Sequence, residues 1–112
     1  MIIDLGDQGV LALVDFLKEN TTLKSLKLLK NKITDEGGVA LANLLYFNKT
    51  LHTINLTQNQ LTEKTLEAFI EAIQAQKSVR LKSLYVSQNL MSLRNVKLKL
   101  KELAELGVNT IL

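Results

Sequence analysis

The chain has 112 residues, which is enough for one domain with one hydrophobic core. Hydrophobic residues make up 46% of it and charged residues 22%, values typical of a folded soluble protein, so disorder over most of the length is excluded. The net charge of +3 and the 4% of aromatic residues argue against a nucleic-acid platform, and the absence of Cys argues against a small disulfide-stabilised secreted fold.

Residues 1–22 are expected to form an incomplete repeat that contains one helix. Leu5-Gly6-Asp7-Gln8-Gly9 aligns with Ile33-Thr34-Asp35-Glu36-Gly37 further along, at the start of a predicted helix. Ile3 stands where the later copies have Asn, and most of a preceding strand is missing. We therefore expect either a capping helix at this end or a fragment of a longer stack of repeats.

A pattern of alternating apolar and polar residues then occurs three times, and each copy predicts a strand with one buried face, followed by a turn and a helix. The copies are Leu23-x-x-Leu26-x-Leu28-x-x-Asn31-x-Ile33, Leu51-x-x-Ile54-x-Leu56-x-x-Asn59-x-Leu61 and Leu81-x-x-Leu84-x-Val86-x-x-Asn89-x-Met91. They begin 28 and 30 residues apart, so the sequence predicts stacked repeats at 23–50, 51–80 and 81–107. The two extra residues are assigned to a longer loop, Gln76-Lys77-Ser78-Val79-Arg80.

The helix that follows each strand has a predicted start and one apolar stripe. The start positions are Gly6, Thr34, Thr62 and Ser92, where a hydroxyl can accept a first-turn amide and the acids that follow the first three suit the helix dipole. The stripes are Leu13, Phe16 and Leu17; Leu41, Leu44 and Leu45; and Phe69, Ala72 and Ile73. Asn20 and Asn48 are expected to close the first two helices in the left-handed conformation.

The last part of the chain leaves one ambiguity. Residues 96–101 alternate in a way that fits a strand, but their place in the repeat favours a helix that ends at Gly107. Val108-x-x-Ile111 matches Leu81-x-x-Leu84, so residues 108–112 are expected to begin a fourth strand.

These motifs resemble the leucine-rich repeat, and the period with a full helix resembles its ribonuclease-inhibitor-like subtype. The resemblance implies a single α/β domain over residues 1–112, a right-handed solenoid with parallel strands on the concave face and helices on the convex face. It also implies that Asn31, Asn59 and Asn89 form a ladder that satisfies buried backbone groups at the turns. Such a fold offers a binding surface and usually no pocket, so we expect no enzymatic activity.

Residues between the buried strand positions face solvent and are the candidate contacts of a protein partner. Tyr85 is the best single anchor, because it combines a large contact area with a polar tip. The full set is Lys24, Ser25, Lys27, Leu29, Lys30, His52, Thr53, Asn55, Thr57, Gln58, Lys82, Ser83, Tyr85, Ser87 and Gln88.

Two groups of basic residues have a functional and a plain interpretation. Lys24, Lys27, Lys30 and Lys32 form a basic edge without an intervening acid, which suits an acidic partner but also suits an exposed strand that avoids aggregation. Arg94, Lys97, Lys99 and Lys101 would spread around a helix near Glu102 and Glu105, so a solvated helix face is expected there.

The sequence gives no set of residues for catalysis or for cofactor or metal binding. His52 is the single histidine and has no clustered ligands or acid–base partners in the pattern. Gly37-Gly38 lacks the Lys-Ser/Thr of a phosphate loop and is expected to ease the start of a helix.

The sequence therefore predicts an interaction module or adaptor that binds a protein partner, with no nucleic acid and no membrane. One alternative is a regulator of an enzyme such as a small GTPase, although Arg80 and Arg94 lie outside the predicted concave strands. Another is a structural subdomain of a larger assembly, with self-association through uncapped ends. No signal peptide is apparent, so an intracellular location is expected, or a secreted effector that acts inside a host cell.

Overall fold

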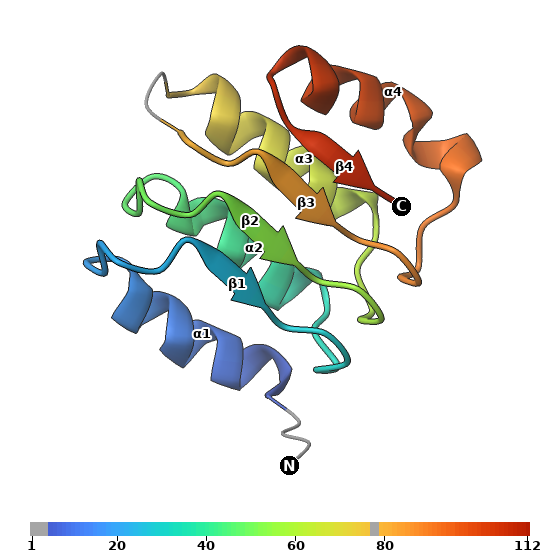
Figure 1. The fold of residues 1–112 in the computed structure, drawn as a ribbon. Coiled ribbons are helices and arrows are strands. Elements are labelled where there is room, and N and C mark those ends of the chain that lie inside the picture. The colour runs from blue at the N-terminus through green and yellow to red at the C-terminus, as the bar shows by residue number, and fades with distance from the viewer. Residues whose placement is uncertain (1–4, 77–78) are drawn as a thin grey trace.

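The computed structural model describes residues 5–76 and 79–112, which form alternating helices and strands (Figure 1). The helices are α1 (Gly6–Leu17), α2 (Asp35–Leu44), α3 (Glu63–Gln74) and α4 (Leu93–Glu105). The strands are β1 (Ser25–Lys27), β2 (Thr53–Asn55), β3 (Ser83–Tyr85) and β4 (Asn109–Ile111). Ile3, Lys77 and Ser78, on which sequence expectations rested, lie outside the described residues.

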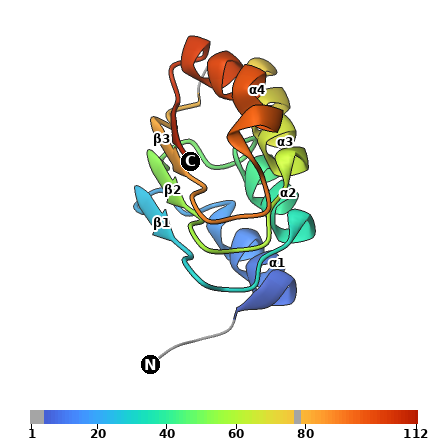
Figure 2. The same ribbon diagram turned by 90° about the vertical axis from the view of Figure 1, so that its right-hand side faces the viewer.

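The strands form one parallel sheet in the order β1-β2-β3-β4, and the helices form a second layer on one face of it (Figure 2). Leu26, Ile54 and Leu84 pair in register across three neighbouring strands. This arrangement confirms the predicted α/β solenoid. We call the sheet face opposite the helices the outward face, the edge where strands begin the amino edge, and the edge where they end the carboxyl edge.

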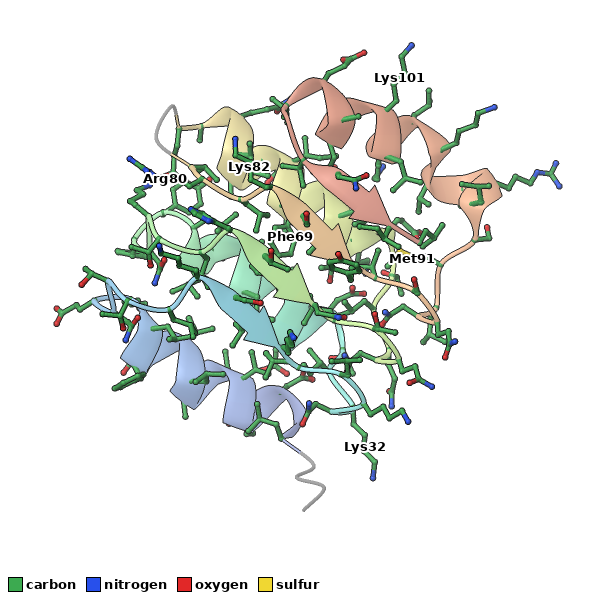
Figure 3. The ribbon with its side chains drawn as sticks, viewed as in Figure 1. Lys32, Phe69, Arg80, Lys82, Met91 and Lys101 are labelled. Atoms are coloured by element: carbon green, nitrogen blue, oxygen red, sulfur yellow. The ribbon has the colours of Figure 1, made fainter. Side chains whose placement is uncertain are left out.

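The core lies between the two layers and is built from the repeated apolar positions. Leu26, Ile54 and Leu84 are buried, and Phe69 of α3 lies fully buried near the centre (Figure 3). Burying each such side chain contributes about 1.5–3 kcal/mol. Because strand side chains alternate, burial of these positions turns their neighbours toward the outward face.

At the carboxyl edge, asparagine side chains join successive turns. The Asn59 amide donates to the Leu28 and Leu56 carbonyls, each at 2.9 Å, and its Oδ1 accepts from the Asn31 and Ile33 amides at 2.9 and 3.1 Å. Asn89 repeats this arrangement one repeat later, with a donor bond to Leu56 at 2.9 Å. The turns are thereby fixed relative to one another.

An acidic side chain makes a second link between repeats at the same edge. Asp35 accepts from the Thr62 amide at 2.9 Å, from the Thr62 hydroxyl at 2.6 Å and from the Thr65 hydroxyl at 2.7 Å. Burial alone would raise the pKa of Asp35, but these hydrogen bonds stabilise the carboxylate and hold its pKa below the ordinary value of 3.8. Asp7 makes the corresponding bonds to Thr34 and Gly37.

Gly37 and Gly38, in the first turn of α2, allow close contact between repeats, a role that the sequence did not indicate. A Cβ on Gly38 would lie 2.2 Å from Thr65 Oγ1 of the next repeat and 2.8 Å from Leu61 Cδ2. The helix start itself is provided by Thr34, whose hydroxyl accepts from the Glu36 amide at 3.4 Å.

At the amino edge, Asn20 and Asn48 do not adopt the predicted left-handed conformation. Asn48 is buried, donates to the Leu17 and Asn20 carbonyls at 2.8 and 3.0 Å, and accepts from the Thr50 and Leu51 amides. The side chain has this role because asparagine can both donate and accept, and the loop between helix and strand offers both kinds of backbone group.

The predicted apolar stripe of α1 is wrong at Phe16, because this side chain is 70% exposed. The equivalent Leu44 and Ala72 are fully buried. Leu44 lines a groove between α1 and α2, so the position that Phe16, Leu44 and Ala72 share in their helices faces the preceding helix. No described helix packs on that side of α1.

The C-terminal repeat follows the prediction in part. Residues 96–101 are helical, and α4 ends before Gly107, which has a φ of 86°. Val108 is buried as expected, but Thr110 rather than Ile111 pairs with Leu84. β4 thus loses one residue relative to its neighbours, which leaves the buried Thr110 hydroxyl without a hydrogen-bond partner among the described residues.

Candidate partner-binding surface

The predicted contact residues lie in rows that cross the outward face, with one member from each of the first three repeats. The parallel register and the loop hydrogen bonds define these rows, and neighbouring strands are about 4.8 Å apart. From the amino to the carboxyl edge they are Lys24, His52 and Lys82; Ser25, Thr53 and Ser83; Lys27, Asn55 and Tyr85; Leu29, Thr57 and Ser87; and Lys30, Gln58 and Gln88.

The central row combines a cation, an amide and an aromatic ring. Asn55 Oδ1 accepts from the Thr57 amide at 3.1 Å and from its hydroxyl at 2.7 Å, so its carbonyl side is engaged. Tyr85 is half-buried, and its hydroxyl makes no hydrogen bond within the described part of the chain. β4 extends the row, because Ile111 pairs with Tyr85 and is also half-buried.

The row at the turns has an unusual backbone. Lys30, Gln58 and Gln88 have φ values of 56°, 59° and 56°, in the left-handed region. This conformation costs a non-glycine residue roughly 1–2 kcal/mol. The asparagine bonds on the adjacent residues hold the turns in place. The exposed side chains of the row therefore project from fixed positions.

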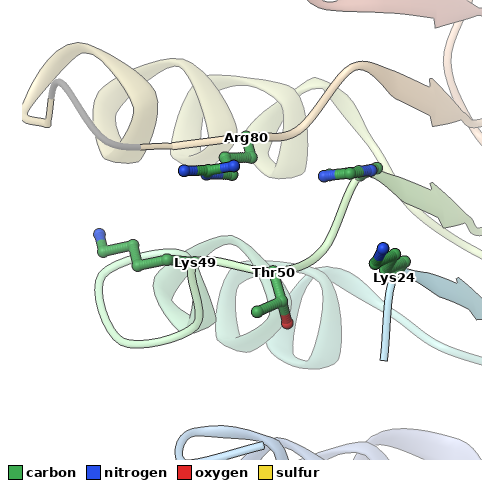
Figure 4. A pocket seen from close by; sticks show the side chains of 5 residues that line it. Lys24, Lys49, Thr50 and Arg80 are labelled. Atoms are coloured by element: carbon green, nitrogen blue, oxygen red, sulfur yellow. The ribbon is translucent and has the colours of Figure 1, made fainter. Parts of the chain in front are cut away.

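A basic depression of about 280 Å³ lies at the amino edge. Its lining comes from the loops that lead into β1, β2 and β3 (Figure 4). The lining residues are Lys24, Lys49, Thr50, His52 and Arg80. Lys82 lies two residues after Arg80, and its side chain is exposed. Among the residues that the structure describes, no acidic side chain lines the depression.

Two residues of the basic depression are held by the surrounding loops. Lys49 Nζ donates to the Leu45 carbonyl at 3.0 Å and to Gln76 Oε1. The Thr50 hydroxyl bonds to the Leu23 carbonyl at 3.0 Å. These two side chains are therefore held in place by hydrogen bonds within the fold.

The predicted basic edge is divided by the structure. Lys24 joins the basic depression, Lys27 lies in the central row, and Lys30 and Lys32 lie in the turn at the opposite edge, where Figure 3 labels Lys32. The charges thus run along β1, the outer strand of the sheet, and do not form one cluster.

The second basic group lies on α4, away from the outward face. Arg94, Lys97 and Lys101 are exposed there and Lys99 is half-buried, and Figure 3 labels Lys101. This second basic group on α4 can therefore serve as a control for the basic residues at the amino edge.

The outward face carries polar side chains and one tyrosine. Among residues 5–76 and 79–112, no three His, Cys, Asp or Glu side chains cluster as metal ligands. None of the helices in those ranges has the length and apolar character needed to cross a membrane. Hydroxyls, amides, Tyr85 and lysines can recognise a polar protein surface by hydrogen bonds and charge.

The layers and register define a leucine-rich-repeat solenoid. Residues 19–42 and 47–69 each match the family model described as Leucine Rich repeat. A similar solved structure is that of "Leiomodin-1 Actin-Binding Site 2 (ABS2)", with a TM-score of 0.76 and 19% sequence identity over 97% of this chain and 67% of that chain. The sequence matched none of the curated proteins with which it was compared. Repeats and fold together support a protein–protein interaction module in general.

Sequence reasoning missed several members of this surface. Lys49, Thr50 and Arg80 lie in loops just before the strand motifs, and the sequence aligns Ile111 with the buried Leu84, whereas it pairs with Tyr85. A usable signal existed for the loop residues. Thr50 directly precedes Leu51 and Arg80 directly precedes Leu81, so these two residues lie at equivalent places in consecutive repeats, and Lys49 lies one position earlier.

Proposed function

We propose that this chain is an interaction module of the ribonuclease-inhibitor-like repeat subtype that binds a protein partner through the outward face. The repeat spacing of 28 and 30 residues and a full helix in each repeat support the subtype. The partner would lie across the rows, with Tyr85 as the anchor.

The observation that carries this proposal is the central row. Tyr85 stands half-buried between Asn55 and Ile111, with its hydroxyl directed to no partner in the described chain. A half-buried tyrosine on a fixed sheet loses little conformational freedom on binding, which is a property of interface hot spots.

Photo-crosslinking tests the surface. A crosslinking amino acid at Thr53 or Ser83 should capture a partner from the native source, whereas the same group at Glu67 or Glu71, exposed on α3, should not. Tyr85→Ala should reduce capture from Ser83 at least tenfold. Equal capture from both faces would contradict the proposal.

Actin is the first specific protein to test, because the similar structure is that of an actin-binding site of leiomodin-1. Co-sedimentation of the chain with filaments, and its Tyr85→Ala variant as the control, would decide this. Binding that is equal for both proteins would exclude the outward face as the actin contact.

A structural role in a larger assembly is a second candidate, and the exposed Phe16 on α1 favours it. Sedimentation of the wild type and of Phe16→Ser tests this role. A complex that dissociates only in the variant would support an assembly contact at α1, and a monomer in both cases would argue against it.

A further inference from the structure

We propose that the basic depression receives an acidic, extended segment of the partner protein, with Asp or Glu carboxylates lying over Lys24, Arg80 and Lys82. The inference rests on the proposed function and specifies the chemistry of the partner. It uses a part of the surface that the central row does not include.

The first argument is uncompensated charge. Within the described ranges, the one ion pair closer than 4.0 Å joins Lys18 to Asp15, on α1. Arg80 and Lys82 therefore remain without a carboxylate, although both are exposed beside the same depression. Like charges about 5–10 Å apart repel by roughly 0.5 kcal/mol in water, so an arriving anion removes a repulsion and adds an attraction.

Helix ends do not account for these charges. The C-termini of α1, α2 and α3 lie toward this edge and favour nearby cations. Lys49 performs that function, because its ammonium bonds to the Leu45 carbonyl at the end of α2. Lys24, Arg80 and Lys82 make no such bond in the described structure, so their charges are available to a ligand.

The second argument is spacing. His52 donates its amide to the Lys24 carbonyl at 2.7 Å, and Lys82 donates to the His52 carbonyl at 2.7 Å, which places the three side chains on neighbouring chain segments. At about 4.8 Å per strand, the outer members are roughly 10 Å apart. Alternate side chains of an extended peptide are about 6.8 Å apart. The distance between two carboxylates at positions i and i+2 is therefore larger than the spacing of neighbouring strands and smaller than the distance between Lys24 and Lys82.

The third argument is volume. A depression of about 280 Å³ accommodates a few side chains. A helix about 10–12 Å in diameter is too wide to enter a depression of this volume. An extended segment is narrow enough to place side chains in the depression and to present its carboxylates to Lys24, Arg80 and Lys82.

A labelled synthetic peptide with alternating glutamates and serines tests the proposal by fluorescence anisotropy at about 0.15 M salt, where screening suppresses diffuse attraction. The same peptide with glutamines is the ligand control. We expect the Arg80→Glu, Lys82→Glu double variant to weaken binding at least tenfold. The matched variant Lys97→Glu, Lys101→Glu carries the same net charge on α4 and should change binding less than twofold.

The outcomes separate the possibilities. Equal weakening in both double variants, or equal binding of the glutamine peptide, would overturn the site, since either result indicates nonspecific attraction. Binding only when the serines are phosphorylated would overturn the carboxylate assignment in favour of a phosphopeptide. Circular dichroism of each variant verifies folding, and Lys24→Gln, at an exposed position, provides an independent milder change with an expected threefold loss.

The two proposals can fail separately. If crosslinking from Thr53 persists at full yield in the Arg80→Glu, Lys82→Glu variant, the outward face binds its partner without the basic depression, and this inference is wrong. If the glutamate peptide binds at the amino edge while no partner is captured from Thr53 or Ser83, the acidic ligand is retained and the proposed use of the central row is wrong.

Discussion

The two edges of the sheet are built on opposite principles. At the carboxyl edge, Asn59 and Asp35 bond to backbone and hydroxyl groups of neighbouring repeats, so both side chains are used within the fold. At the amino edge, the exposed cations Lys24, Arg80 and Lys82 face no acid. The comparison indicates that one edge stabilises the stack, while the other holds charge that folding does not use.

The largest loss of stability should come from Asn59→Ala. The substitution leaves the Leu28 and Leu56 carbonyls and the Asn31 and Ile33 amides without their partner. We expect a loss of about 3–5 kcal/mol in the free energy of unfolding, measured by urea denaturation. Asn31→Ala is the control, with an expected loss of about 1 kcal/mol because Asn31 is only half-buried. Equal losses would show that the ladder does not depend on burial.

Gly38→Ala should be the next most damaging change. The new methyl group would lie 2.2 Å from Thr65 Oγ1, and we expect a net loss of about 2 kcal/mol after the helix preference of Ala is included. Thermal melts of Gly38→Ala, Thr65→Ala and the double variant measure the coupling. The double variant should lose less than the sum of the single losses; strict additivity would place the strain elsewhere.

Asp35→Asn should have a smaller effect that depends on pH. Because the pKa of Asp35 is lowered on folding, its carboxylate contributes stability above the unfolded value of 3.8, and this contribution disappears as the pH falls through the folded pKa. We expect the variant to be about 1 kcal/mol less stable than wild type at pH 7 and to approach it at pH 3. Denaturation at the two pH values measures the difference. Glu63→Gln, at the equivalent but exposed position, should show little effect at either pH.

The smallest effect on stability should come from the amino edge. Lys24→Gln with Arg80→Gln should change the free energy of unfolding by less than about 0.5 kcal/mol, because both side chains are exposed and make no bond within the described structure. Lys49→Gln should cost more, since it removes the bond to Leu45. A loss above about 1 kcal/mol in the double variant would mean that these cations stabilise helix ends.

The fold was predictable because its signal is local and repeated. The alternating leucines of each copy specify a strand with one buried face, and Thr34 and Thr62 specify helix starts. Phe16 was misassigned because burial at its column depends on a preceding helix, which is information outside the helix itself. The position of Ile111 could not be read because β4 lacks one residue, and a deletion inside a short strand changes pairing without changing the apolar pattern.

The candidate site was predictable on the strands and the residues next to them, but not in the loops further away. The outward row of Lys27, Asn55 and Tyr85 follows from alternation alone. Lys49 and Arg80 approach Lys24 through loops of unequal length, and no periodic rule gives the direction of a loop side chain. The hydrogen bond between Asp35 and Thr62 of the next repeat could not be predicted either. An acid in the first turn of a helix is already explained by its favourable interaction with the helix dipole.

The asparagine ladder has a mechanical consequence. Its steps join only adjacent repeats, as Asn59 does with Leu28 over 31 positions and Asn89 with Leu56 over 33. Tension applied between α1 and α4 would therefore load the joints in series, so the weakest one would open first and leave the others intact. Extension would proceed by successive detachment of single repeats, and each could reattach to the face that remains.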